Sequence, residues 1–282
     1  MKIKLVTDCS ANICANITQD ISYVPLKIVT QNKEYIDTED LNVPEMLKEL
    51  QEYKGKSGTA CPGVTEWLDA FGDADIVLGV SLTSNLSGCY NAAIIAAEEY
   101  MQAKPGAKVF ILDSLTTGPE LQLILEKYQE LIDRQMAFED ICREINEYLT
   151  HTHLIFSLAS VDNFAKNGRV NPMIAKAVGL LGLRIVGRAS AEGTLEPMHK
   201  CRGEKKALQT LMTTMNELGY RGGKVRLSHS YNPAAADAFA DMIRASYPNS
   251  DITICCNRGL CCYYAEEGSL LIGFEDGDTC AI

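Results

Sequence analysis

This chain of 282 residues has few positive charges for its size and no long apolar runs. Its formal net charge of -11 argues against nucleic acid or an anionic membrane surface as the main partner. No apolar stretch reaches the roughly 18 residues that a membrane span needs. Residues 1–8 have the pattern of a first strand and lack that of a signal peptide. We therefore expect a cytoplasmic protein without a membrane span.

The sequence also lacks a CxxC motif and a Cys/His pairing at zinc spacing in its densest cysteine group, although it holds eleven cysteines. This group consists of Cys255, Cys256, Cys261 and Cys262. Together with the neighbouring isoleucines, these residues have the pattern of an apolar strand, in which a free cysteine acts as a small hydrophobe. The pattern favours structural burial over metal or redox chemistry.

A turn rich in hydroxyl groups and lacking lysine and arginine lies within residues 75–97. A short apolar run at 76–80 precedes it, and residues 92–97 have the pattern of a buried helix. A strand that leads through a Ser/Gly turn into a helix can bind an anion, because the first helical N–H groups lack partners and the helix dipole favours negative charge. The motif GxxxxGK[ST] is absent, which argues against a nucleoside triphosphate. The neutral donors suit a carboxylate, whereas the alternative is a serine N-cap on an ordinary turn.

Strands alternate with helices over the first 150 residues. We expect strands at 2–7, 23–30, 75–81 and 107–113, and helices at 44–53, 65–71, 121–135 and 138–150. This alternation predicts an α/β domain with a mostly parallel sheet and flanking helices. Ligands of such sheets bind beyond the carboxyl ends of the strands. Three of these ends carry polar turn residues, at 8–10, 81–88 and 113–118, and their convergence strengthens the case for a site.

The pattern becomes less regular after residue 151. We expect short helices at 162–168 and 171–179, longer amphipathic helices at 204–217 and 234–247, and strands at 153–158, 183–189, 193–200, 224–229, 251–256 and 269–274. The sequence therefore predicts two domains, an N-terminal α/β domain at 1–150 and a C-terminal α+β domain at 151–282.

Seven short segments, in order along nearly the whole chain, resemble motifs of the DegV family of bacterial fatty-acid-binding proteins. The strongest match is residues 83–90, which are similar to S-S-x-L-S-G-T-Y. The others are residues 6–13 (V-T-D-S-T-A-D-L), 57–62 (T-S-x-P), 112–114 (I-D-S), 167–170 (G-G-R-I), 200–208 (K-x-R-G-x-x-K-A-L) and 229–233 (H-x-D-N-P).

The resemblance implies a carrier and not an enzyme. It implies that a long-chain fatty acid lies in a tunnel between the two domains, and that no cofactor or metal is needed. The carboxylate would meet Thr59, Ser87, the Gly88 backbone and Tyr264, which aligns with a histidine of the family's H-T-G-P-G motif. A fatty acid kinase would phosphorylate the bound acid, and Arg169 and Arg202 would face that partner.

Two other classes of function remain open on the residues alone. Asp8 and Asp113 stand at strand ends, where two carboxylates could bind Mg²⁺ or act in phosphoryl transfer. No phosphate-binding lysine or paired acidic motif accompanies them. Cys61 precedes Pro62 and could begin a helix, where a thiol becomes more reactive, as in a redox protein.

Overall fold

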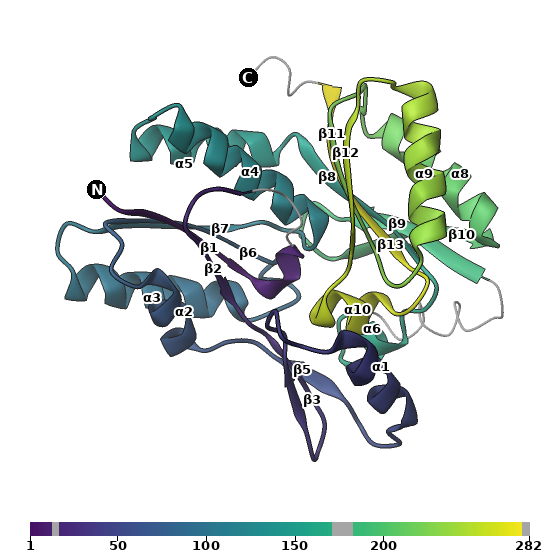
Figure 1. The fold of residues 1–282 in the computed structure, drawn as a ribbon, viewed down its shortest axis with the longest axis horizontal. Helices are drawn as coiled ribbons and strands as arrows, with labels where there is room; N and C mark the ends of the chain where they lie inside the picture. The colour runs from purple at the N-terminus through teal and green to yellow at the C-terminus, as the bar shows by residue number, and fades with distance from the viewer. Residues whose placement is uncertain (13–16, 171–182, 278–282) are drawn as a thin grey trace.

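The computed structural model describes residues 1–12, 17–170 and 183–277. Two sheets lie side by side, and the helices cover their outer faces and fill the space between them (Figure 1). A third, small sheet lies below the junction of the two larger ones, next to three short helices. The expected α/β class is confirmed, with a parallel sheet in the first part of the chain and a mixed sheet in the second.

The first sheet has four parallel strands in the order β2-β1-β6-β7. These are β1 (Ile3–Asp8), β2 (Ile21–Val24), β6 (Ile76–Ser81) and β7 (Lys108–Asp113). Helices α2 (Val64–Phe71) and α3 (Cys89–Ala103) cover one face, while α4 (Pro119–Asp133) and α5 (Phe138–Leu149) cover the other (Figure 1). Because all four strands are parallel, their carboxyl ends lie along one edge.

Side chains of this sheet alternate between two apolar cores. Val6 packs with Trp67 and Phe71 under α2 and α3, whereas its neighbour Leu5 packs with Ile124 under α4. Such alternation follows from the two-residue period of a strand. Both faces are buried, as is typical of parallel sheets with crossover helices.

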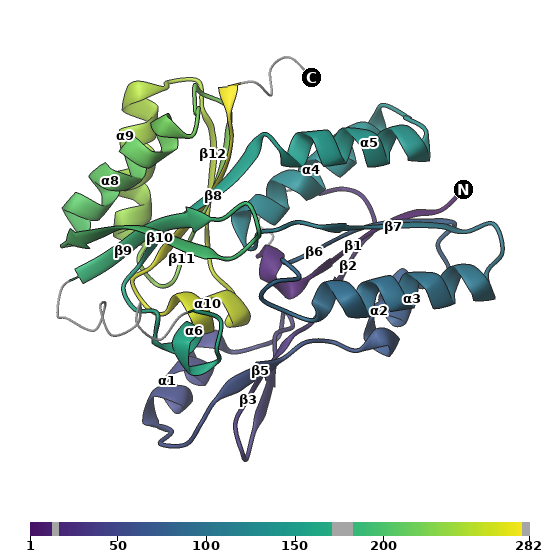
Figure 2. The ribbon, with the colours of Figure 1, turned by 180° about the vertical axis from the view of Figure 1, so that it is seen from behind.

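The second sheet has six strands in the order β10-β9-β8-β13-β11-β12, and only its β11–β12 pair is parallel. The strands are β8 (Thr152–Leu158), β9 (Leu183–Ala189), β10 (Leu195–Arg202), β11 (Lys224–His229), β12 (Asp251–Cys256) and β13 (Leu270–Glu275). Helices α8 (Glu204–Glu217) and α9 (Pro233–Ser246) cover its outer face (Figure 2).

Helix α4 joins the two sheets, because it packs on β6 of the first and on β13, β11 and β8 of the second. The close approach depends on Gly273 of β13. A Cβ at that position would lie 2.5 Å from the Glu120 backbone nitrogen and 2.7 Å from its Cα atom. Only a residue without a side chain fits such a contact.

The small sheet has the order β4-β3-β5, formed by β3 (Lys27–Val29), β4 (Glu34–Ile36) and β5 (Gly58–Ala60). Helix α1 (Val43–Glu52) packs against α10 (Gly259–Ala265), which also contacts β3 and α6 (Asp162–Lys166). A short 3-10 helix, η1 (Cys9–Ala11), follows β1 and also contacts α10.

The structure corrects three predictions from the sequence, two about secondary structure and one about burial. The strand expected at 23–30 is two strands, β2 and β3, in different sheets, because Pro25 between them has no N–H to continue a ladder. Cys261 and Cys262 belong to helix α10 and not to a strand. Cys256 is exposed, whereas burial was expected. The helix expected at 171–179 lies outside the described residues.

Candidate ligand-binding site

Asp8 organises two of the three polar strand ends. One of its carboxylate oxygens accepts a hydrogen bond from the Ser10 backbone N–H at 3.0 Å. The other accepts from the Leu82 backbone N–H at 2.7 Å and from the Ser81 hydroxyl at 3.1 Å. Asp8 is fully buried, and this burial raises its pKa above the ordinary value, although the three donors lower it. The side chain therefore holds the end of β1 against the turn after β6.

Asp113 holds the third strand end, that of β7, against the same turn after β6. Its Oδ1 atom accepts from the Ser84 backbone N–H at 3.0 Å and from the Leu115 N–H at 3.3 Å. The predicted convergence of the three polar ends is thus confirmed. Both aspartates act on backbone N–H groups, and the residues that the structure describes contain no cluster of acidic, histidine or cysteine side chains suited to a metal ion.

The turn held by these aspartates ends at Ser87 and Gly88, directly before α3. The Ser87 hydroxyl accepts from the Cys89 backbone N–H at 3.3 Å, while Gly88 is the N-cap of the helix. A Cβ at position 88 would lie 3.1 Å from the Cys61 sulfur, so a glycine allows β5 and its following loop to approach closely. The positive end of a fifteen-residue helix lies here beside a half-buried hydroxyl, an arrangement suited to an anion.

Thr59 and Tyr264 meet next to this turn, although 205 residues separate them in the sequence. Their hydroxyl oxygens are 2.7 Å apart and share one hydrogen bond. The Tyr264 ring also packs on Phe164 of α6, with 4.8 Å between the ring centroids. Burial raises the pKa of Tyr264 above its usual value, so its hydroxyl stays protonated and can donate.

Helix α10, which carries Tyr264, is capped from a distant part of the chain. Asp37 is buried and accepts from the backbone N–H groups of Gly259 at 3.0 Å and Leu260 at 2.8 Å. The Asn12 side-chain oxygen accepts from the Arg258 N–H at 2.8 Å. The sequence analysis missed both caps. No local pattern could have found them, because each lies more than 200 residues from the helix that it caps.

A cavity of about 290 Å³ brings together the predicted ligand-binding residues Thr59, Ser87, Gly88 and Tyr264. Its wall comes from both parts of the chain. The remaining lining is mostly apolar and consists of Leu26, Ala60, Cys61, Leu82, Leu86, Thr117, Phe164, Arg169, Leu260, Cys261, Ala265 and Leu271. The polar groups are few, as in typical sites for apolar ligands that carry one polar group.

The structure separates the two predicted partner-binding arginines. Arg169 lines the cavity, is exposed, and donates from Nε to the Leu86 carbonyl at 3.0 Å. Its positive charge lowers the pKa of Tyr264, although the effect of burial is larger. Arg202 is also exposed but lies at the end of β10, an edge strand of the six-stranded sheet, outside the cavity wall.

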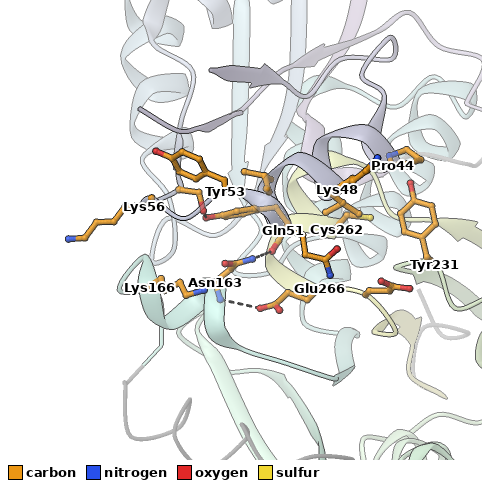
Figure 3. Close-up of a pocket in the computed structure, with 16 residues that line it drawn as sticks. Pro44, Lys48, Gln51, Tyr53, Lys56, Asn163, Lys166, Tyr231, Cys262 and Glu266 are labelled. Atoms are coloured by element: carbon orange, nitrogen blue, oxygen red, sulfur yellow. Dashed lines mark hydrogen bonds between the residues drawn. The ribbon is translucent and has the colours of Figure 1, made fainter. Parts of the chain in front are cut away.

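A larger groove of about 1000 Å³ lies between α1, α6 and α10 (Figure 3). Its wall is of mixed charge, with Lys48, Lys56 and Lys166 as well as Glu266 and Glu267. It contains none of the predicted ligand-binding residues. Helix α10 contributes to both cavities, with Tyr263 at the groove and Tyr264 at the smaller cavity.

The parallel sheet, the mixed sheet and the cavity that both parts of the chain line define an α/β protein with two large sheets and one small one. The chain belongs to the DegV family, whose model, described as one of uncharacterised proteins, matches residues 2–276. A DegV domain-containing protein of Streptococcus gordonii is 37% identical over 281 residues, which cover 98% of this chain and 100% of the relative.

Two solved structures are very similar to this fold. A DegV family protein from Eubacterium eligens, loaded with heptadecanoic acid, is 42% identical, with a TM-score of 0.95 over 97% of this chain and 99% of that one. The fatty acid kinase (Fak) B3 protein of Streptococcus pneumoniae, loaded with linoleic acid, is 36% identical, with a TM-score of 0.95 over 98% and 99%. In the described part of this chain, no helix has the length and apolar character to cross a membrane.

Proposed function

We propose that this protein binds one long-chain fatty acid in a tunnel between the part with the parallel sheet and the part with the mixed sheet. The carboxylate would lie at Ser87 and the acyl chain would fill the tunnel. The observation that carries the proposal is the smaller cavity. The hydroxyl groups of Thr59, Ser87 and Tyr264 lie at this cavity together with the N-terminus of α3, while leucines and Phe164 form much of the remaining wall.

The two parts of the ligand would be held by different forces. Each methylene group removed from water contributes about 0.8 kcal/mol, so an acyl chain supplies most of the affinity. The carboxylate would accept hydrogen bonds from Ser87, the Gly88 backbone and the hydroxyl pair of Thr59 and Tyr264, in which one hydroxyl donates to the other and the second donates to the ligand. The α3 dipole would favour its charge. Arg169 adds a positive charge at the wall of the same cavity. The fatty acids named for the two similar structures support this choice of ligand.

A comparison of oleate with oleyl alcohol tests the carboxylate site. The alcohol retains the apolar chain but lacks the charge, so calorimetry should show the acid binding about tenfold more tightly or better. Ser87→Ala should weaken oleate binding by about 1–2 kcal/mol, because a hydrogen bond to a charged acceptor is lost, and should leave the alcohol nearly unaffected.

Ser84→Ala is the matched control, because Ser84 is a half-buried serine of the same turn that lies outside the cavity wall. It should bind both ligands like the unchanged protein. Equal affinities for acid and alcohol, or equal losses in the Ser87 and Ser84 variants, would show that the turn does not bind a carboxylate.

We also propose that the bound acid is presented to a fatty acid kinase, which would phosphorylate its carboxylate. The similarity to the Fak B3 protein supports this role. Arg169 and Arg202 would contact the kinase, because an exposed guanidinium can form bidentate hydrogen bonds with acidic groups. In this proposal the protein is a carrier, and the kinase supplies the catalytic groups.

Arg202→Ala separates carriage from presentation. Because Arg202 lies outside the cavity, oleate affinity should be unchanged, while phosphorylation of the bound acid by a cognate kinase should slow. The exposed Arg134 at the C-cap of α4 offers a matched control, and Arg134→Ala should change neither quantity. If both arginine variants are phosphorylated at the unchanged rate, Arg202 has no role in presentation.

A further inference from the structure

Helix α6 positions one positive charge at the smaller cavity. Arg169 lies just beyond the end of this helix, and its backbone N–H donates to the Phe164 carbonyl at 2.8 Å. Phe164 packs on Tyr264 of α10, the helix next to α6 (Figure 2). Arg169 is therefore fixed by the same helix that supports one of the proposed carboxylate donors.

The guanidinium of Arg169 contacts the turn that leads into α3. Its Nε atom donates to the Leu86 carbonyl at 3.0 Å, and its Nη1 atom donates to the Asn167 carbonyl at 2.5 Å. Leu86 directly precedes Ser87, and both residues line the cavity. A guanidinium has five N–H groups in one rigid plane, so these two bonds orient the plane and leave other donors for a ligand.

The wall of the smaller cavity changes in character from its buried part to its exposed part. The leucines at positions 82, 260 and 271 are buried, the hydroxyl-bearing Thr59, Ser87 and Tyr264 are half-buried, and Arg169 is exposed. Among the described residues of this wall, Arg169 alone carries a charge. A ligand with its acyl chain among the leucines and its carboxylate at the hydroxyl groups would direct any group attached to the carboxylate toward Arg169.

We propose that Arg169 is a specificity-determining residue that binds the phosphoryl group of a long-chain acyl phosphate. The inference rests on the proposed function, because an acyl phosphate is the product that a kinase would form from the bound acid. Phosphorylation turns the carboxylate into a neutral carbonyl and places the negative charge on a terminal group with three oxygens. The hydroxyl groups suit the carbonyl, whereas the planar guanidinium can donate to two phosphoryl oxygens at once.

This role is distinct from the proposed contact of Arg169 with the kinase, because it concerns the ligand alone and is measured without a partner protein. It makes the protein selective between the acid before phosphorylation and the acyl phosphate after it. The phosphorylated ligand, with more charge beside the guanidinium, is the one that binds more tightly.

Competition of a stable analogue against radiolabelled oleate tests this selectivity. In the analogue, a CH₂ group replaces the oxygen between the carbonyl carbon and the phosphorus of oleoyl phosphate, which gives a β-ketophosphonate that water does not cleave. At slightly alkaline pH, the unchanged protein should bind this probe about tenfold more tightly than oleate, because an arginine–phosphoryl pair adds charge-assisted hydrogen bonds. The dimethyl ester of the probe, which lacks the charge, should bind no more tightly than oleate.

Three arginine variants assign the effect. Arg169→Gln should lose the preference for the probe and bind oleate within about threefold of the unchanged protein, because the contribution of an exposed charge to a carboxylate is small. Arg169→Lys retains the charge without the planar fork and should keep part of the preference. Arg134→Ala, which alters an exposed arginine outside the cavity wall, should keep all of it.

The outcomes separate this inference from the proposed function. If oleate binds but the probe binds no more tightly, or if Arg169→Gln keeps the preference, the phosphoryl-binding role is overturned and the fatty-acid site stands. A protein that binds neither oleate nor the probe would overturn the proposed function together with this inference.

Discussion

The hydroxyl groups of Thr59 and Tyr264 are 2.7 Å apart and belong to distant segments of the chain. Each hydroxyl fixes the direction of the other, so a carboxylate that accepts from one depends on both. Phe164 supports the Tyr264 ring from the other side. At the residue scale, the site is thus a coupled pair of donors beside a helix N-terminus.

We expect Thr59→Val and Tyr264→Phe each to weaken oleate binding by about 1 kcal/mol, because each removes one hydroxyl and keeps the shape of its side chain. The double variant should lose clearly less than the sum, because the two groups act as a unit. A calorimetric double-mutant cycle measures this coupling. Full additivity would mean that the hydroxyl groups contact the ligand independently, or that only one of them does.

Helix α10 is the element on which the candidate site depends most. It is only seven residues long, and its first N–H groups are satisfied by Asp37 and not by a neighbouring residue. A Cβ at Gly259 would lie 2.7 Å from the Asp37 Oδ1 atom, so the cap requires glycine there. The distant cap fixes the position of Tyr264.

Asp37→Ala should lower the free energy of unfolding by about 2–3 kcal/mol, because two backbone donors at the start of a buried helix lose their acceptor. Oleate binding should weaken as well, because α10 carries Tyr264. Asp40→Ala, an exposed change three residues further on, should stay within about 0.5 kcal/mol of the unchanged protein. Urea unfolding and calorimetry measure the two effects. An Asp37 variant as stable as the Asp40 control would disprove the capping role.

Glu120 lies at the other important contact between elements, the first turn of α4 against β8. It accepts a hydrogen bond from the Thr152 hydroxyl at 2.7 Å, and complete burial raises its pKa to about 7. Between the ordinary glutamate pKa and pH 7, the folded protein keeps a proton that the unfolded chain has lost. The stabilisation that protonated Glu120 contributes is therefore complete below the ordinary glutamate pKa and is lost as the pH rises to about 7.

Glu120→Gln removes this proton linkage. Relative to the variant, the unchanged protein should lose about 3 kcal/mol of stability between pH 4.5 and 7.5, at about 1.4 kcal/mol per pH unit over most of the range. Urea titrations of both proteins at several pH values give the difference. A difference that stays constant across this range would show that Glu120 titrates normally.

Across the whole molecule, the elements that the sequence could predict are those with strong periodicity or a clear strand end. The parallel sheet, its helices and the convergence of Asp8, Ser81 and Asp113 follow from such patterns. Thr59 and Tyr264 came only from the resemblance to a family, because β5 has three residues and α10 has seven, too few to show a period. The Asp37 cap depends on tertiary contact alone.

The division of the chain near residue 150 stays a prediction. The two larger sheets do fall on either side of it, but α4 packs on both and α10 returns to the N-terminal part. A proposed tunnel between two parts that are joined in this way would enclose a ligand on several sides. Such a ligand should leave slowly and remain bound through purification.

Native mass spectrometry of the protein purified from a bacterial host without detergent tests the central claim most directly. We expect each chain to carry the additional mass of one long-chain fatty acid, which unfolding releases as a free acid. Protein that shows the mass of the sequence alone, and whose spectrum does not change when oleate is added, would contradict the proposal that this chain is a fatty-acid carrier.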